Sequence, residues 1–227
     1  MRTGGIMKKE ISQEAPDKAG TPEAVLKALN FCYGKAVTGI PKTKNCYELA
    51  DEYLKKYPDR QKAAKKFINW QIAKCTTTGF VAGFGGLATM AIAIPADLTT
   101  TWYIQLRMIA VLAIIAGLEP SDDCVRTLAY IIISGSSLTK ALKEVGIKVA
   151  NKAALAAIKK IPGSLLISIN KKVCFRLFTK MGSKGVINLG KIVPVAGALV
   201  GAGLDFAETK VVASRAFKTF ILNDFEE

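Results

Sequence analysis

Histidine is absent from all 227 residues of this chain. Its absence excludes Ser-His-Asp triads, histidine general bases and zinc sites of mixed Cys/His type. Neither a CxxC pair nor a phosphate-binding GxxxxGK[ST] loop occurs, so we expect no metal and no cofactor. The cysteines stand singly, at Cys32, Cys46, Cys75, Cys124 and Cys174.

No apolar leader segment follows the first methionine, so we expect reduced thiols and a cytoplasmic location, with the protein peripherally associated with the membrane or partly inserted into it. Sustained strand-type alternation is also missing, which predicts an all-α helical bundle. Half of the residues (50%) are hydrophobic, and the length suits a single core. We expect a disordered tail over 1–20, one helical domain over 21–222 and an acidic end over 223–227.

Capping signals divide the first part of the chain into helices. Thr21, followed by proline and glutamate, is typical of a helix start, and this helix should run to about Val37. A capping box of the Asn45 and Glu48 type predicts a short helix that Pro58 ends, and the next residue, Asp59, can cap a third.

Turn residues divide the second part. A helix is expected over 125–133, followed by a break at 134–137 and a second break at 161–163. An amphipathic helix should occupy 164–181 and end at the glycines of 182–185. A more polar helix should then begin at Asp205 and end near Leu222.

Two long apolar stretches meet at residues 95–97. Residues 75–96 carry no charge, and in residues 98–117, which Asp97 can cap, Arg107 is the only charged residue. Each arm of ~20 residues would be ~30 Å long as a helix, enough to cross a bilayer core. The pair therefore predicts an apolar hairpin that forms either the bundle core or a membrane-facing element.

Glycines with small-xxx-small spacing occur at Gly79 and Gly83 and again at Gly197 and Gly201. This spacing lets helix backbones approach closely in lipid or in a protein core. We favour the protein core, because glycine lowers helix propensity and an unpaired Arg107 in a bilayer would cost ~2.5–3.5 kcal/mol. Inside a bundle an acid such as Asp205 could pair with it.

A pattern Asp-x₃-Thr-x₅-Arg follows each glycine-rich stretch. It indicates either a degenerate internal repeat, in which the two units exchange partners, or a chance match of common residue types. Its members are Asp97, Thr101 and Arg107 in the first copy, and Asp205, Thr209 and Arg215 in the second.

Positive charge is concentrated in one segment. Residues 124–204 hold thirteen bases and one acid, Glu144, so this part supplies most of the net charge of +14. A solvated face is the simplest interpretation, but such one-sidedness favours an anionic lipid surface at ~1 kcal/mol per nearby lysine. Nucleic acid is disfavoured, because aromatic residues are few and lysine outnumbers arginine. The candidate lipid-binding residues are Lys148, Lys152, Lys159, Lys160, Lys171, Lys172, Lys180 and Lys184.

Two blocks of this sequence resemble the EcsC protein family. The first combines the run 79–88 with 94–98 and Gln105-Leu106-Arg107, and the second is 193–205, continuing to Thr209; the family commonly has Asn where this chain has Asp205. The resemblance covers roughly residues 67–220. It implies a bacterial helical protein, sometimes suspected of acting at membranes, and it supplies no catalytic residues. The family-pattern polar positions are Asp97, Thr101, Gln105, Arg107, Asp205, Thr209 and Arg215.

Three functions remain open. The first is a membrane-associated interaction protein that binds anionic lipid, a membrane partner such as a transporter, or both, without catalysis. The second is a pore-forming or membrane-perturbing effector that inserts the hairpin. The third is an enzyme acting on lipid or peptide, with Asp97, Arg107 and Asp205 in one site.

Overall fold

A computed structural model describes residues 21–41, 43–75, 96–147, 156, 158–188 and 196–224, with the side chains of 74–75, 96–97, 181–188 and 196–205 outside the description. Every regular element in these ranges is helical, which confirms the predicted all-α bundle. In chain order they are α1 (Pro22–Thr38), α2 (Cys46–Lys56), α3 (Arg60–Cys75), α6 (Ala96–Ile115), α7 (Asp123–Ser134), α8 (Leu138–Lys143), α10 (Gly163–Asn188), α11 (Ala196–Phe217) and the π-helix η2 (Lys218–Leu222).

The first three helices begin at the predicted caps. Thr21 accepts a hydrogen bond from the Ala24 amide at 3.2 Å, and both halves of the Asn45 capping box are present. The Asp59 carboxylate accepts from the Lys62 amide at 2.7 Å. Each cap satisfies an amide that the first turn of a helix leaves without a partner, so local sequence sets these boundaries.

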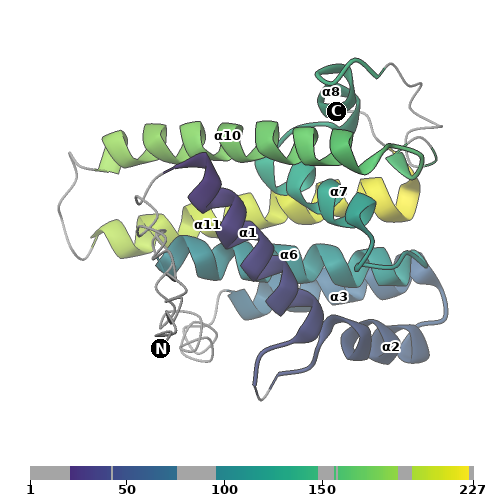
Figure 1. The fold of residues 1–227 in the computed structure, drawn as a ribbon. Helices are drawn as coiled ribbons and strands as arrows, with labels where there is room; N and C mark the ends of the chain where they lie inside the picture. Colours follow the sequence, from purple (N-terminus) through teal and green to yellow (C-terminus); the bar gives the residue numbers. More distant parts are fainter. Residues whose placement is uncertain are drawn as a thin grey trace, which may run out of the picture.

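Helix α6 lies at the centre of the bundle. It packs against α1, α2, α3, α7 and α11, while α10 packs across α1 and α7. In Figure 1, α6 and α11 run in the same direction, α3 runs antiparallel to α6, and α1 crosses them at a steep angle. This surrounding shell explains why residues 102–113 of α6 are buried around the whole circumference of the helix.

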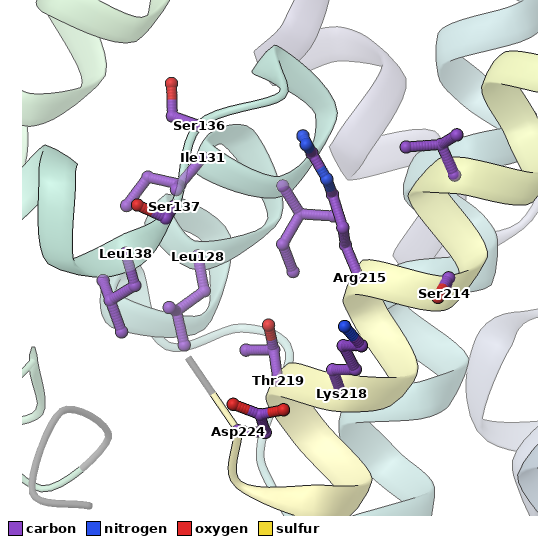
Figure 2. A pocket seen from close by; sticks show the side chains of 12 residues that line it. Leu128, Ile131, Ser136, Ser137, Leu138, Ser214, Arg215, Lys218, Thr219 and Asp224 are labelled. Atoms are coloured by element: carbon purple, nitrogen blue, oxygen red, sulfur yellow. The ribbon is translucent and has the colours of Figure 1, made fainter. Parts of the chain in front are cut away.

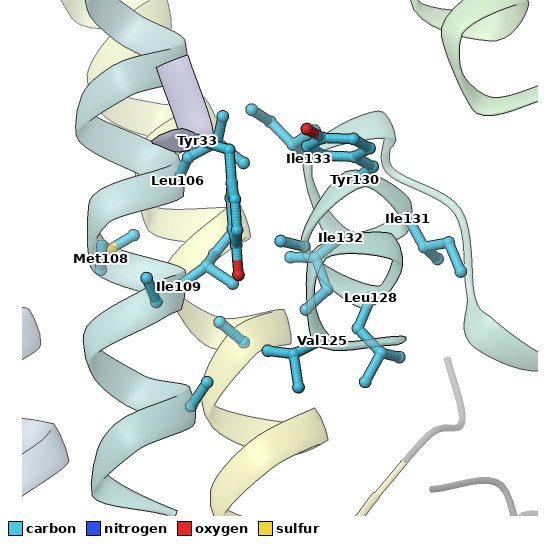
Figure 3. Packing of buried hydrophobic residues seen from close by; sticks show 14 of the residues in the cluster. Tyr33, Leu106, Met108, Ile109, Val125, Leu128, Tyr130, Ile131, Ile132 and Ile133 are labelled. Atoms are coloured by element: carbon cyan, nitrogen blue, oxygen red, sulfur yellow. The ribbon is translucent and has the colours of Figure 1, made fainter. Parts of the chain in front are cut away.

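Aliphatic and aromatic side chains of α1, α6 and α7 fill the core (Figure 3). The rings of Tyr33 and Tyr130 meet edge to face with centroids 5.9 Å apart. Both hydroxyls are bonded at 2.8 Å, from Tyr33 to the Pro120 carbonyl and from Tyr130 to the Asn30 side chain. The pair therefore ties α1 to α7 without burying an unpartnered hydroxyl.

Two glycines end helices in the left-handed region. Gly117 follows α6 with φ 84°, and Gly135 caps α7 with φ 78°. Glycine adopts this conformation at no steric cost, which makes it the usual residue after a helix end. The predicted stops at 117 and 134–137 are confirmed.

Three predicted boundaries are wrong. The glycines at 182–185 do not end the amphipathic helix, because α10 continues to Asn188, and Asp205 does not begin a helix, because it lies inside α11. Asp97 lies inside α6 rather than capping it. For the glycines the reason is quantitative: an interior glycine costs only about 1 kcal/mol relative to alanine, and residues 182–188 contain no proline that would end the helix.

Only the second arm of the expected apolar hairpin can be described. Residues 76–95, with Gly79 and Gly83, lie outside the described residues, whereas Leu98–Ile115 is the one helix in the described ranges with the length and hydropathy of a membrane span. That stretch is 78% buried inside the bundle. In this structure, α6 therefore serves as the core of the bundle.

Candidate functional site

The structure brings two of the family-pattern polar positions together. The Gln105 side-chain amide on α6 donates to the Thr209 hydroxyl on α11 at 3.3 Å, and both residues are buried. Thr101, one turn before Gln105, is half-buried. A buried polar contact therefore joins α6 to α11.

Gln71 adds a further buried amide to this region. It lies eleven residues after Arg60, whose guanidinium donates to the Ala116 carbonyl at 3.1 Å, and Gln105 lies eleven before Ala116 on the antiparallel helix. The two glutamines are thus at about the same level. Gln71 is fully buried, and neither its oxygen nor its nitrogen has a partner among the described residues.

Arg107 is also buried, with 5% of its surface exposed. Its guanidinium donates to the Lys44 carbonyl, its Nε has no partner in the described ranges, and burial lowers its pKa. The side chains of Asp97 and Asp205 lie outside the description. A site joining these three residues, and the partner exchange of the sequence repeat, therefore stay predictions.

The outward side of α10 carries an amphipathic stripe. Ile167 and Phe175 are large apolar residues left 57% and 58% exposed, and Lys171 lies between them at the same four-residue spacing. Thr179, also exposed, continues this row, and the exposed Lys172 lies beside it. We call these five residues the α10 face; from Ile167 to Thr179 it is ~18 Å long.

A charged network lies next to the α10 face. Arg176 forms an ion pair with Glu144 at 2.6 Å and also donates to the Ser136 hydroxyl. Lys172 donates to the Glu144 carbonyl, which is neutral, so this lysine keeps its charge available. Glu144, Lys172 and Arg176 also line a shallow hollow beside Phe175.

The predicted lipid-binding lysines fall into three groups. Lys159, Lys160, Lys171 and Lys172 are exposed, the first two in the turn that precedes α10. Lys180 is exposed but pairs with Glu208 of α11 at 2.7 Å, which offsets its charge. Lys148 and Lys152 and the side chain of Lys184 lie outside the description. Gly197 and Gly201 lie on α11, and the packing around them is outside the description.

A second concave site lies between α7, the turn to α8 and the end of α11 (Figure 2). This α7–α11 cavity has a volume of about 210 Å³. Its lining residues are Leu128, Ile131, Ile132, Ser136, Ser137, Leu138, Val211, Ser214, Arg215, Lys218, Thr219 and Asp224. It contains one family-pattern position, Arg215, and adjoins the Arg176 network through Ser136.

The sequence interpretation missed Ile167, Phe175 and the α7–α11 cavity. The apolar pair had a readable signal, because an isoleucine and a phenylalanine flank Lys171 at helical spacing on its own stripe. The cavity had no such signal in the sequence, because its walls come from segments some 80 residues apart, such as those of Leu138 and Lys218. Only tertiary packing brings them together.

The acids and thiols of the described ranges are dispersed. No three Cys, Asp or Glu residues there are grouped as metal ligands. The described thiols of Cys32, Cys46, Cys124 and Cys174 are free, and burial raises the pKa of three of them, Cys32, Cys46 and Cys174, to about 12. Such thiols are protonated and weakly nucleophilic near neutral pH.

Comparison with known proteins gives a family-level result. The model of the EcsC protein family matches residues 7–222 of the chain. No curated protein and no solved structure matches it. The matched range includes every helix described above.

Proposed function

The chain belongs to the EcsC protein family, and on that premise we propose that it is a membrane-associated interaction protein whose α10 face binds anionic lipid surfaces. The observation that carries this proposal is the exposure of Ile167 and Phe175 on either side of Lys171. Apolar side chains inserted at the headgroup boundary, with lysines in the headgroup layer, are typical of peripheral amphipathic helices.

The energetics are sufficient for reversible binding. Each lysine near an anionic surface contributes ~1 kcal/mol, and burial of a large apolar side chain contributes ~1.5–3 kcal/mol. Lys171, Lys172, Lys159 and Lys160 make no ion pair with a described residue, so their charges are available. A binding free energy of this size is consistent with a protein that binds a membrane reversibly.

Two further features support a peripheral position at the cytoplasmic face. The one described helix that could span a bilayer is 78% buried, so lipid contact through α10 leaves the fold intact. The cytoplasmic leaflet carries the anionic lipids that attract lysine. Docked in this way, the protein could present its remaining surface to a membrane partner such as a transporter.

Sedimentation with vesicles tests the proposal. The full chain is mixed with vesicles of phosphatidylcholine alone or with added phosphatidylglycerol, at low and high salt, and pelleted protein is then extracted with carbonate. We expect pelleting that requires the anionic lipid, weakens with salt and is reversed by carbonate. Absence of binding would contradict the proposal, and carbonate resistance with dye release would support the pore-forming alternative instead.

Matched variants locate the binding surface. Lys171→Glu should lower vesicle partitioning roughly 10–30-fold, because two charge units near the surface change at ~1 kcal/mol each. Lys66→Glu makes the same change in net charge on the exposed surface of α3 and should have a much smaller effect. Phe175→Ser should weaken binding, whereas Leu222→Ser, at a side chain 46% exposed in η2, should not.

A further inference from the structure

The α7–α11 cavity has two chemically different walls. Leu128, Ile131 and Leu138 form an apolar wall on α7 and α8, while Arg215, Lys218 and Thr219 face them from α11 and η2 (Figure 2). Most small-molecule sites are mainly apolar with a few polar groups that fix orientation, and this cavity has that composition. A ligand that fits both walls must itself be amphiphilic.

Thr219 is an independent indication of a ligand. The residue is only 8% exposed, and its hydroxyl makes no hydrogen bond with any residue in the described ranges. Figure 2 shows its oxygen turned toward the open centre of the cavity. A nearly buried hydroxyl without a protein partner is an available donor for an acceptor placed in that space.

Charge selects the head group. Arg215 and Lys218 supply two positive charges around the cavity and Asp224 one negative charge, which leaves a net charge of +1. Lys218 is exposed at the mouth and makes no ion pair with a described residue. A monovalent anion such as a carboxylate balances this charge, whereas a phosphate monoester with nearly two negative charges exceeds it.

Volume limits the apolar part. About 210 Å³ corresponds to roughly seven times the ~30 Å³ that a water molecule occupies in the liquid. It is also below the ~300–1,000 Å³ usual for drug-sized ligands. A cavity of this volume can therefore hold a single alkyl chain against its apolar wall, with the head group of the ligand at the mouth.

We propose that the α7–α11 cavity binds a medium-chain alkyl monocarboxylate of about eight carbons, with the chain on Leu128, Ile131 and Leu138 and the carboxylate between Lys218 and Thr219. The carboxylate accepts hydrogen bonds from the Lys218 ammonium and the Thr219 hydroxyl. This inference does not depend on the membrane proposal, because its ligand is a soluble monomer and its residues lie outside the α10 face.

Titration with octanoate below its micelle-forming concentration tests this site, with octanol as the uncharged probe of equal chain length. Binding is followed by NMR of isoleucine methyl groups. We expect octanoate to shift the methyl signals of Ile131 and Ile132 and octanol to bind at least several-fold more weakly. Equal binding of the two probes, no binding of octanoate, or shifts confined to other isoleucines would each overturn the proposal.

Two variants identify the head-group contacts. Thr219→Val removes the hydroxyl at nearly constant volume and should weaken octanoate binding roughly two- to tenfold. Lys218→Gln should weaken it roughly three- to tenfold, while Lys66→Gln on α3 should leave it unchanged. Octanol binding should be insensitive to both cavity variants. Unchanged octanoate affinity in folded Thr219→Val and Lys218→Gln proteins would place the carboxylate elsewhere and contradict the assignment.

Discussion

Single polar residues in the core identify where this bundle departs from ordinary apolar packing. Gln71, Gln105 and Thr209 are all buried, yet only the last two are bonded to each other by a described contact. An unpartnered buried amide lowers stability, whereas a bonded one contributes about 0.5–1.5 kcal/mol to it. The three positions are therefore expected to respond differently to apolar substitution.

Gln71→Leu should raise the free energy of unfolding by about 1–3 kcal/mol, because it removes two unbonded polar atoms at similar volume. Gln105→Leu should lower it by about 1 kcal/mol, because the Thr209 hydroxyl loses its donor. Urea unfolding at neutral pH measures both. A loss of stability in Gln71→Leu would mean that its amide has a partner outside the described residues.

The buried thiols make the fold sensitive to alkali. Burial raises the pKa of Cys32 to about 12, whereas an exposed thiol in the unfolded chain titrates near ~8.5. The protonated form is favoured in the fold, so this contribution to stability is complete below the unfolded pKa and is lost as pH rises toward the folded one.

Unfolding free energy should therefore fall between about pH 8.5 and about pH 12, by up to ~1.4 kcal/mol per pH unit for each buried thiol. Cys46 and Cys174 act in the same direction. Cys32→Ala should make the pH dependence shallower by one proton, whatever its effect at neutral pH. Urea titrations across this range provide the measurement, and an unchanged slope in the variant would contradict burial of that thiol.

Individual helices owe their ends to backbone conformation as well as to caps. Gly34 lies within α1 with open space around an added Cβ, while Gly135 has φ 78° and an added Cβ would meet the Arg215 guanidinium at 3.1 Å. Substitution by alanine should therefore change the free energy of unfolding in opposite directions at these two glycines. In α1 it removes a flexible residue from a helix interior, and at Gly135 it forces a side chain into the left-handed region.

Gly34→Ala should raise the free energy of unfolding by about 0.5–1 kcal/mol. Gly135→Ala should lower it by about 1–2 kcal/mol, because the left-handed conformation disfavours a Cβ. Thermal and urea unfolding of the two variants, compared with the parent chain, gives both numbers. Equal effects at the two positions would contradict the assigned end of α7.

The sequence was sufficient for the elements that local chemistry controls. Caps at Thr21, Asn45 and Asp59 and the stops at Gly117 and Gly135 act within a few residues, so their positions could be predicted. The glycines at 182–185 and the acid at 205 carry the same local signals, but a glycine penalty of about 1 kcal/mol is too small to end a helix by itself. Local patterns cannot reveal that balance.

The candidate sites also differ in how far they could be predicted, because some depend on local sequence and others on tertiary packing. The lysines of α10 were identified from charge alone, and the apolar partners Ile167 and Phe175 follow from helical spacing once the helix is known. The α7–α11 cavity depends on how α7 meets α11. The sequence pattern likewise could not predict that α6 and α11 pack in parallel.

At the scale of the whole molecule, α6 is the most apolar of the described helices, and its neighbours enclose it. Residues from Trp102 to Ala113 are buried, with packing partners from both halves of the chain. A membrane-docked state that uses only α10 leaves this enclosure unchanged. An inserted state would have to open it.

Hydrogen exchange distinguishes these states. When the protein binds anionic vesicles, the amides of residues 102–113 should stay as protected as in solution, while exposed positions of α10 such as Lys171 and Phe175 become less accessible. Mass spectrometry of exchanged peptides with and without vesicles gives the comparison. Vesicle-induced exchange in α6 would contradict peripheral docking.

The enclosure of α6 by α11 has a consequence during translation. Residues 196–217 leave the ribosome about 100 residues after α6, which at ~5–20 residues per second is a delay of roughly 5–20 s. Through that interval the nascent chain presents a helix of membrane-spanning length without the partner that later covers one side. The bundle can therefore enclose α6 completely only after the residues of α11 have been synthesised.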